Sequence, residues 1–442
     1  MEYVNVIGAG LAGCEAAWQI SKRGVHVRLF EMKPEKKSAA HKSDKFAELV
    51  CSNSLRNASV SSAIGLLKEE LRRLGSLIME AADNSAVAAG GALAVDRELF
   101  SGYITDKIKA SQNIEIIEGE VKKIPDDSVT VVATGPLTSE ALAEEISGLI
   151  GERKLYFYDA AAPIVEYSSI DMTKAFFASR YGKGSADYIN CPMNEEEYKR
   201  FYNALVTAEC AKLHDFETGE HIKVFEGCMP VEEMARRGED TLRFGPLKPV
   251  GIRHPDTGEK YYAVVQLRRE NSAATMFNIV GFQTHLTFPE QKRVFSMIPG
   301  LENAEFFRYG VMHRNTYISS PGFLSKNYSV ISNPGLFFAG QITGVEGYIE
   351  SASSGFVAGY SAACRISGKT PADFSDKTMI GAMAKYISEG GEAEFQPMNA
   401  NFGIIAPFPE RIKGGKRQRY EAYAERALEE ISKIAPMIIT EF

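Results

Sequence analysis

The chain has 442 residues, 45% of them hydrophobic and 24% charged, which excludes a disordered or membrane-embedded protein and predicts two or three domains of about 100 to 200 residues. A formal net charge of -7 excludes a chain-wide basic surface for nucleic acid, so any RNA contact must come from local patches. No apolar run reaches the about 18 residues of a spanning helix, and the first residues lack a secretory signal, so we expect a cytoplasmic protein without membrane attachment.

A strand, a helix and a second strand open the chain. Their expected ranges are Tyr3–Ile7, Gly10–Lys22 and Val25–Phe30, an arrangement typical of a βαβ unit. Val129–Ala133 and Gly335–Ala339 are further buried-strand runs that end at glycine-containing turns. Together these runs predict an α/β fold with a doubly wound parallel sheet, whose functional turns lie at the carboxyl ends of the strands.

The turn between the first strand and the helix carries the pattern GxGxxG. Its residues are Gly8, Ala9, Gly10, Leu11, Ala12 and Gly13. The first glycine permits a tight turn, the second lets a diphosphate approach the helix amino terminus, and the third allows close helix packing. Glu31 follows at the end of the second strand, at about the 20-residue spacing of an acid that binds ribose hydroxyls. The whole pattern predicts a dinucleotide site.

Two later motifs favour FAD as the dinucleotide. Val131–Gly135 resembles the ATG turn of the glutathione-reductase-like flavoproteins, and Leu336–Ile342 resembles their carboxyl-terminal flavin motif, which precedes a helix expected near Gly347–Ser351. The cofactor-binding residues predicted here are Ala133, Thr134, Gly135, Gly340, Gln341 and Gly347. No second GxGxxG occurs, which disfavours a disulfide reductase with its own NAD(P)H domain. A nicotinamide reductant would meet the flavin transiently.

Between these motifs the sequence changes character, with aromatic and β-prone stretches between helical and turn segments from Leu155 to about Tyr309. We therefore predict an inserted α+β domain at residues 156–309, which faces substrate or RNA. It would be flanked by two parts of an FAD-binding domain, at residues 1–155 and 310–442, the second with a helical carboxyl terminus.

Six cysteines occur without a CxxC pair, which argues against a zinc ribbon, a dithiol or a disulfide scaffold, and no metal site is predicted. A lone cysteine is more often a small buried hydrophobe than a catalyst. We expect that role for Cys14, Cys191, Cys210 and Cys364.

Cys51 and Cys228 lie in more distinctive segments. Phe46–Arg56, Phe225–Glu232 and Pro397–Gly403 resemble signatures of the folate/FAD-dependent tRNA uracil-5-methyltransferases, and the likeness runs from residue 1 to about residue 430. The FAD domain is similar to that of the larger flavoproteins that modify wobble uridine, but those proteins carry a long carboxyl-terminal extension. The length of this chain favours the methyltransferase branch.

The resemblance implies methylation of uridine C5 in the tRNA T-loop. The one-carbon unit would come from 5,10-methylenetetrahydrofolate, the reduction from FADH2, and the electrons from NAD(P)H. Uracil C5 is a poor nucleophile until a thiolate adds at C6, and a base must later remove the C5 proton. On this resemblance Cys228 is the nucleophile and Cys51 handles the C5 proton or flavin-side chemistry, although the exchanged order stays open.

Basic residues supply weaker candidates. His41, Lys42 and Arg56 flank the Cys51 segment and suit either phosphate binding and thiol activation or a solvated loop. For His285 and His313, a core or surface role is favoured over a folate or nucleotide contact. Five cations without an intervening acid suit a tRNA backbone contact and a solvated helix start equally well. They are Arg411, Lys413, Lys416, Arg417 and Arg419.

Other functions stay open from the sequence. The same chemistry on 23S ribosomal RNA is compatible with every motif. A small-molecule flavin oxidoreductase is disfavoured by the contexts of Cys51 and Cys228 and by the missing second glycine fingerprint, and retained thiols disfavour a noncatalytic RNA scaffold. No stable protein partner is implied.

Overall fold

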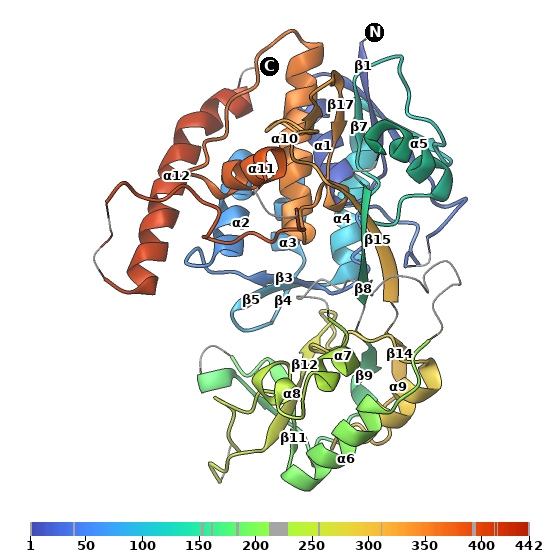
Figure 1. Cartoon of the computed structure of the whole chain (residues 1–442), viewed down its shortest axis with the longest axis vertical. Coiled ribbons are helices and arrows are strands. Elements are labelled where there is room, and N and C mark those ends of the chain that lie inside the picture. The colour runs from blue at the N-terminus through green and yellow to red at the C-terminus, as the bar shows by residue number, and fades with distance from the viewer. Residues whose placement is uncertain are drawn as a thin grey trace.

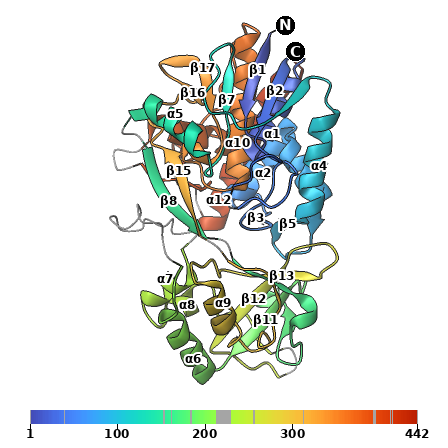
Figure 2. The same cartoon turned by 90° about the vertical axis from the view of Figure 1, so that its right-hand side faces the viewer.

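The computed structural model describes residues 2–440 apart from short gaps and one longer gap. Outside the description lie residues 1, 39, 152–153, 161, 183–184, 212–228, 255–256, 311, 391–394, 411, 413 and 441–442, and the side chains of 154–160, 312–316 and 440. Figures 1 and 2 show two bodies stacked along the long axis of the molecule. No helix within the described ranges is both long and apolar enough to cross a membrane.

The first body is built on a six-stranded sheet in the order β16-β17-β7-β1-β2-β6. Its neighbouring strands are parallel except for the antiparallel pair β16 and β17. The strands are β1 (Tyr3–Ile7), β2 (His26–Glu31), β6 (Ile114–Glu118), β7 (Thr130–Val132), β16 (Ser329–Val330) and β17 (Asn333–Phe338). The predicted α/β fold with a doubly wound parallel sheet is thereby confirmed, and the carboxyl-terminal part of the chain completes the sheet begun by the amino-terminal part.

Helices α1 (Leu11–Ser21) and α10 (Tyr348–Ile366) pack closely against each other beside this sheet. Glycine makes the approach possible, because a Cβ atom built on Gly355 would lie 2.2 Å from the carbonyl oxygen of Ala12. A Cβ atom on Gly359 would lie 2.6 Å from the Ala16 carbonyl oxygen. The amino-terminal ends of both helices are therefore held next to the carboxyl edge of the sheet.

Further helices and a small sheet complete the first body. The helices are α2 (Ala63–Leu74), α3 (Leu77–Asn84), α4 (Arg97–Ala110), α5 (Glu140–Ile150), α11 (Met379–Glu389) and α12 (Lys416–Thr440). The small sheet has the order β3-β5-β4, with β3 (Ser54–Asn57), β4 (Ala86–Val87) and β5 (Ala92–Val95). Helix α2 has a complete set of end signals, since the Ser62 hydroxyl accepts the Gly65 N–H and Gly75 ends the helix with a positive φ of 79°.

The second body contains an antiparallel six-stranded sheet in the order β10-β11-β12-β13-β9-β14. Its elements are β9 (Ile164–Glu166), β10 (Phe176–Ala178), β11 (Tyr188–Met193), α6 (Glu195–Val206), α7 (Val231–Arg236), α8 (Thr241–Phe244), β12 (Ala263–Arg269), β13 (Met276–Ile279), α9 (Phe288–Phe295) and β14 (Phe306–Arg308). A separate apolar cluster that includes Phe201, Phe277 and Phe295 forms its core. The arrangement agrees with an inserted α+β unit.

Strands β8 (Lys154–Ala160) and β15 (Met312–Ile318) pair antiparallel where the chain passes between the two bodies (Figure 1). The sequence placed the Leu155–Tyr158 stretch inside the inserted domain, whereas this strand pairs with neither six-stranded sheet. The exact division at residues 156 and 309 stays a prediction.

Candidate active site

A deep cavity lies at the carboxyl edge of the parallel sheet. It encloses about 1110 Å³ of empty space, part of it open to solvent, and the turns that follow β1, β2, β7 and β17 all line it. The predicted cofactor residues that line this cavity are Gly8, Ala9, Gly10, Leu11, Ala12, Glu31, Ala133, Thr134, Gly135, Gly340 and Gln341. Segments more than 300 residues apart are thus brought to one site, as the predicted topology requires.

The three glycines of the GxGxxG turn have different surroundings. A Cβ atom on Gly10 would meet no atom within 4 Å, so that position faces open space. A Cβ atom on Gly13 would lie 1.8 Å from the Gly8 carbonyl oxygen, and Gly8 itself has a φ of +97°. Gly8 and Gly13 therefore shape the turn, whereas Gly10 leaves room for a ligand at the start of α1.

Glu31 is held in place by backbone donors. Its carboxylate accepts the Ala9 N–H at 2.8 Å and the Lys33 N–H at 2.9 Å, and the side chain is 7% exposed. The carboxylate thereby ties the end of β2 to the glycine turn. Each carboxylate oxygen has further acceptor capacity, so Glu31 can still accept ribose hydroxyls from a bound dinucleotide.

Several cavity residues were not predicted as cofactor contacts, among them Tyr348 and Ser351 at the start of α10. His41 also lines the cavity, and its Nδ1 atom lies 2.6 Å from the Ser38 hydroxyl. Burial, followed by the nearby Lys33 cation, lowers the pKa of His41 to about 4. His41 is therefore a neutral hydrogen-bonding group at pH 7 and provides no positive charge for a phosphate.

Gly347 does not line the cavity, although the sequence placed it among the cofactor contacts. A Cβ atom there would lie 2.3 Å from Glu350 Oε2 and 2.8 Å from an Arg56 guanidinium nitrogen, and its φ is +119°. Arg56 forms an ion pair with the buried Glu350 and donates to Asn399 Oδ1 at 3.0 Å. Gly347 makes room for this ion pair, and Arg56 anchors the start of α10 to the Asn399 segment.

The Cys51 turn follows directly on Val50, which lines the cavity. The backbone N–H groups of Cys51 and Ser52 donate to the Tyr348 hydroxyl at 2.8 Å and 3.2 Å. Tyr348 is itself a cavity residue, and burial, with the nearby Cys51 as a second cause, raises the pKa of its phenol above the ordinary value. Tyr348 therefore links the thiol segment to the cavity as a neutral hydrogen-bonding group.

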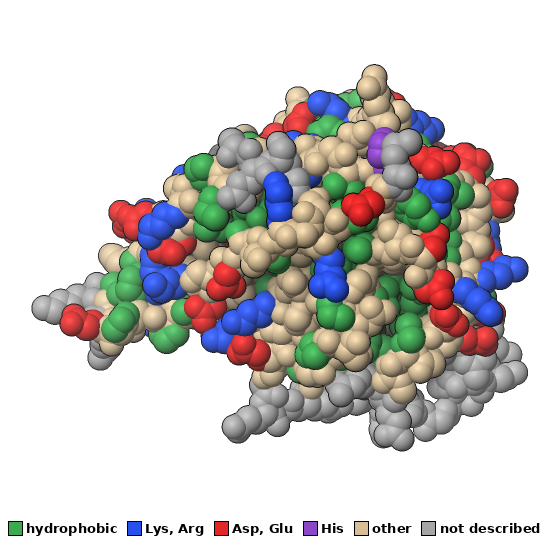
Figure 3. Space-filling model, turned by 90° about the horizontal axis from the view of Figure 1, so that it is seen from above, with side chains coloured by type: hydrophobic (Ala, Val, Ile, Leu, Met, Phe, Trp, Pro, Cys, Tyr) green, Lys and Arg blue, Asp and Glu red, His purple; other side chains and the backbone are tan. Residues whose placement is uncertain are grey.

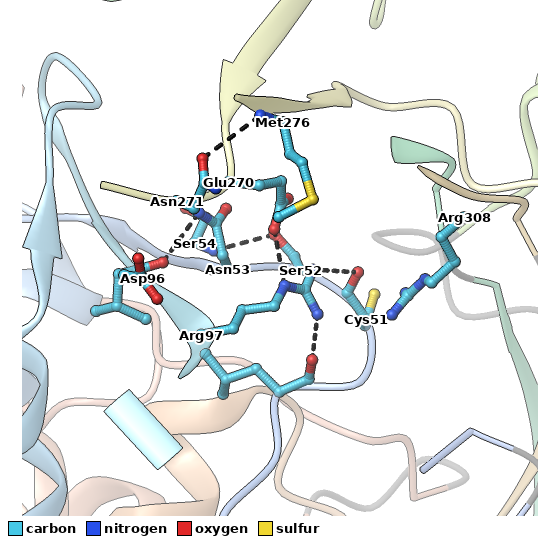
Figure 4. Close-up of polar contacts among 12 residues, drawn as sticks. Cys51, Ser52, Asn53, Ser54, Asp96, Arg97, Glu270, Asn271, Met276 and Arg308 are labelled. Carbon is cyan, nitrogen blue, oxygen red and sulfur yellow. Dashed lines mark hydrogen bonds and ion pairs between the residues drawn. The ribbon is translucent and has the colours of Figure 1, made fainter. Parts of the chain in front are cut away.

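Arginine side chains from three elements contact the same turn, and Figure 4 shows two of them, Arg97 and Arg308. Arg97 of α4 donates to the carbonyl oxygens of Leu49 and Cys51, and Arg308 of β14 donates to the Val50 carbonyl at 2.6 Å. Arg268 of β12 donates to the Ser52 hydroxyl at 2.7 Å and to Asn53 Oδ1 at 3.1 Å. Arg268 and Arg308 come from the second body, so the Cys51 turn lies where the two bodies meet.

Comparisons with known proteins place the chain in a family. Residues 3–370 match the family model described as glucose inhibited division protein A. A protein of Acetivibrio thermocellus named methylenetetrahydrofolate–tRNA-(uracil-5-)-methyltransferase TrmFO is 60% identical over 97% of both chains. The chain belongs to the TrmFO family. The TrmFO of Bacillus licheniformis is 58% identical over 98% of both chains.

A solved structure supports the same fold for this TrmFO-family chain. GidA of Aquifex aeolicus superposes with a TM-score of 0.69 at 18% identity, covering 99% of this chain and 75% of the other. At that identity the likeness concerns the fold alone. It agrees with a parallel dinucleotide-binding sheet that carries a second body.

The second signature cysteine of this TrmFO-family chain, Cys228, lies outside the described residues, as does the first half of its signature segment. Cys14, Cys191 and Cys364 are buried, as expected for small apolar side chains. Cys210 is half-buried, lies close to Glu232 and His285, and accepts a hydrogen bond from Arg236 at 3.5 Å. Burial raises the pKa of the Cys210 thiol above its ordinary value.

The basic stretch is only partly described, since Arg411 and Lys413 lie outside the described residues. Lys416, Arg417 and Arg419 are exposed at the start of α12, where Arg417 pairs with Glu421 at 2.8 Å. On the face seen in Figure 3, basic and acidic side chains are mixed. The described part of the basic stretch thus presents three exposed cations, one of which is paired with an acid.

Proposed function

We propose that this chain transfers a one-carbon unit from 5,10-methylenetetrahydrofolate to C5 of a uridine in the T-loop of tRNA, in the cytoplasm. Family membership supports the reaction class, because the TrmFO relatives are named for that donor and for tRNA. The observation that carries the proposal is the position of Cys51. Its backbone N–H donates to Tyr348, which lines the cavity, and this proximity supports a single site made up of the thiol and the cofactor.

The cavity is suited to FAD. The open position at Gly10, the α1 amino terminus and Glu31 would hold the diphosphate and ribose, while the Gly340 turn and the start of α10 would hold the flavin end. Bound FAD supplies the reducing electrons for methyl formation. NAD(P)H is the proposed source of these electrons, and it would visit the site transiently.

The two signature thiols divide the remaining work. A thiolate adds to uracil C6, which makes C5 nucleophilic enough to form a bond to the activated methylene carbon. A base then removes the C5 proton while the bond between the methylene carbon and the folate nitrogen breaks, which releases tetrahydrofolate and leaves an exocyclic methylene at C5. Addition of a hydride equivalent to this methylene, with loss of the thiolate from C6, gives the methyl group and restores the ring double bond. We assign the addition to Cys228 and the proton to Cys51. The position of Cys51 beside the Tyr348 hydroxyl supports a role for it in the site.

Nucleoside analysis tests the proposed substrate. In a strain that lacks the gene, mass analysis of digested tRNA should show loss of 5-methyluridine, and digested 23S ribosomal RNA should be unchanged. Expression of the wild-type chain should restore the nucleoside, whereas Cys51→Ala should not. Unchanged tRNA together with a loss from ribosomal RNA would replace tRNA by ribosomal RNA as the substrate.

A trapping experiment tests the order of the thiols. RNA that carries 5-fluorouridine has no C5 proton to lose, so an enzyme with an intact nucleophile should form a stable covalent adduct that gel electrophoresis resolves. Cys51→Ala should retain the adduct and Cys228→Ala should lose it, with both variants still binding FAD. The reverse pattern would exchange the two roles.

A further inference from the structure

Three guanidinium groups hold the turn on both sides of Cys51, two through backbone carbonyls and one through the side chains of Ser52 and Asn53. They come from Arg97, Arg268 and Arg308, on α4, β12 and β14 respectively, and in Figure 4 the Arg308 side chain points toward the Cys51 side chain. Their hydrogen bonds to the turn fix the carbonyls of residues 49 to 51 and the hydroxyl of Ser52. The turn is thereby held with its cations in place before any substrate binds.

The charges around the thiol do not balance. The three arginines are hydrogen-bonded to the turn, and the Glu270 carboxylate pairs with Arg97 at 2.7 Å. Three positive charges and one negative charge leave a net charge of +2 in a largely buried region, since Arg268 is 8% and Glu270 is 3% exposed. Tyr348 is the other titratable group in contact, and burial keeps its phenol neutral.

The arginines also influence one another. Burial lowers the pKa of Arg308, and the positive charge of Arg97 lowers it further. An ionised Cys51 acts in the opposite direction and raises the pKa of Arg97, Arg268 and Arg308 alike. By reciprocity these cations favour the ionised form of the thiol, as cations do at other reactive cysteines.

We propose that Arg97, Arg268 and Arg308 are positioning residues that hold the Cys51 side chain as a thiolate at neutral pH. A thiolate at this position can accept a proton, which is the task assigned to Cys51 in the proposed function. This inference rests on the proposed function only in saying what the thiolate does. Whether Cys51 is ionised is measured without RNA or folate, so a neutral Cys51 thiol and a protein without methyltransferase activity are separate results.

Alkylation by iodoacetamide measures the ionisation, because only the thiolate reacts and the reagent carries no charge. The rate for Cys51 is followed by peptide mass analysis of the FAD-bound protein between pH 5 and pH 10. In the wild type, the pH of half-maximal rate should lie below that of Cys210 in the same protein. Arg308→Gln should raise the Cys51 midpoint by about one pH unit. Arg308→Lys keeps the positive charge, so its midpoint should lie close to the wild-type value.

Glu270→Gln provides a test of opposite sign that does not depend on the folding of the Arg308 variants. Removal of this carboxylate increases the net positive charge, so the Cys51 midpoint should fall. The Cys210 midpoint should stay unchanged in every variant. Cys51 midpoints that are equal in wild type, Arg308→Gln and Glu270→Gln would overturn the proposal, as would parallel shifts of Cys51 and Cys210.

Discussion

At the scale of single residues, Gly10 and Gly13 lie in the same turn but have different surroundings. A Cβ atom on Gly10 meets open space, whereas one on Gly13 would lie 1.8 Å from the Gly8 carbonyl oxygen. Gly10→Val should therefore preserve the fold and abolish FAD binding. Gly13→Ala should lower the free energy of unfolding by about 1–3 kcal/mol, because the backbone at Gly8 must move to make room for the added methyl group.

Flavin absorbance per mole of protein and the melting temperature of the cofactor-free protein separate the two effects. A Gly10→Val protein that holds one FAD per chain would show that the diphosphate does not lie at this turn. A Gly13→Ala protein with unchanged stability would contradict the close packing of α1 on the turn.

Some residues of the candidate site could be predicted from the sequence and others could not. The positions of the glycine turn and of Glu31 beside it were predictable, because they depend on local spacing that the sequence displays directly. Arg268 and Arg308 were not, since they reach the Cys51 turn from more than 200 residues away and follow no local motif. In the sequence they stand out only as charged residues within β-prone segments, a pattern that is equally typical of a strand exposed to solvent. Gly347 lies against the Arg56–Glu350 ion pair, and its predicted cofactor contact stays a prediction.

At the scale of elements, one buried carboxylate joins two helices. Glu70 of α2 accepts the N–H groups of Met379 and Ile380, at 2.7 Å and 2.8 Å, at the start of α11. Burial raises its pKa to about 7, although the two N–H donors act in the opposite direction. Because the pKa of Glu70 is higher in the folded state than in the unfolded chain, the protonated carboxyl stabilises the fold. This stabilisation is complete below pH 4.5 and is lost as the pH rises through 7.

Urea unfolding at several pH values tests this linkage, with Glu70→Gln as the comparison because an amide does not titrate. Between pH 4.5 and pH 7 the free energy of unfolding of the wild type should fall relative to the variant by an amount on the order of 2 kcal/mol. At all pH values the variant also loses one backbone hydrogen bond, worth about 1–2 kcal/mol. If the two curves stay parallel, Glu70 does not titrate in this range.

Most predicted elements of the parallel sheet agree with the structure to within one or two residues. The strand predicted at Tyr3–Ile7 is β1 itself, and the strand predicted at Val25–Phe30 is β2 at His26–Glu31. Strand β1 is buried along most of its length, and β2 buries every second residue, so their apolar residues mark both strands. The antiparallel order of the second sheet was not predictable, because it depends on pairing between distant strands such as β9 and β14.

At the scale of the whole molecule, RNA must bind a chain whose net charge is -7. Lys416, Arg417 and Arg419 form an exposed cationic segment, and Tyr420 beside them stacks on Phe402 with ring centroids 4.3 Å apart. Replacing the three cations by glutamine should weaken tRNA binding. It should also reduce the slope of log K against log salt by about three, one for each phosphate contact.

A matched control separates local contacts from total charge. Lys109, Lys122 and Lys123 are also exposed, and neutralising them changes the net charge by the same amount. This control should bind tRNA with a nearly unchanged salt slope, and both triple variants should retain their flavin. Equal slopes for the wild type and the Lys416 triple variant would show that this segment is a solvated surface.

The most direct test of the central claim follows labelled carbon in a purified reaction. The protein is supplied with FAD, NAD(P)H, tRNA and either methylene-labelled tetrahydrofolate or methyl-labelled S-adenosylmethionine, and the T-loop uridine is then isolated. We predict label at C5 from the folate alone, and none when Cys51→Ala replaces the wild type. Label from S-adenosylmethionine, or none from the folate with a flavin-loaded wild-type protein, would contradict the proposed reaction.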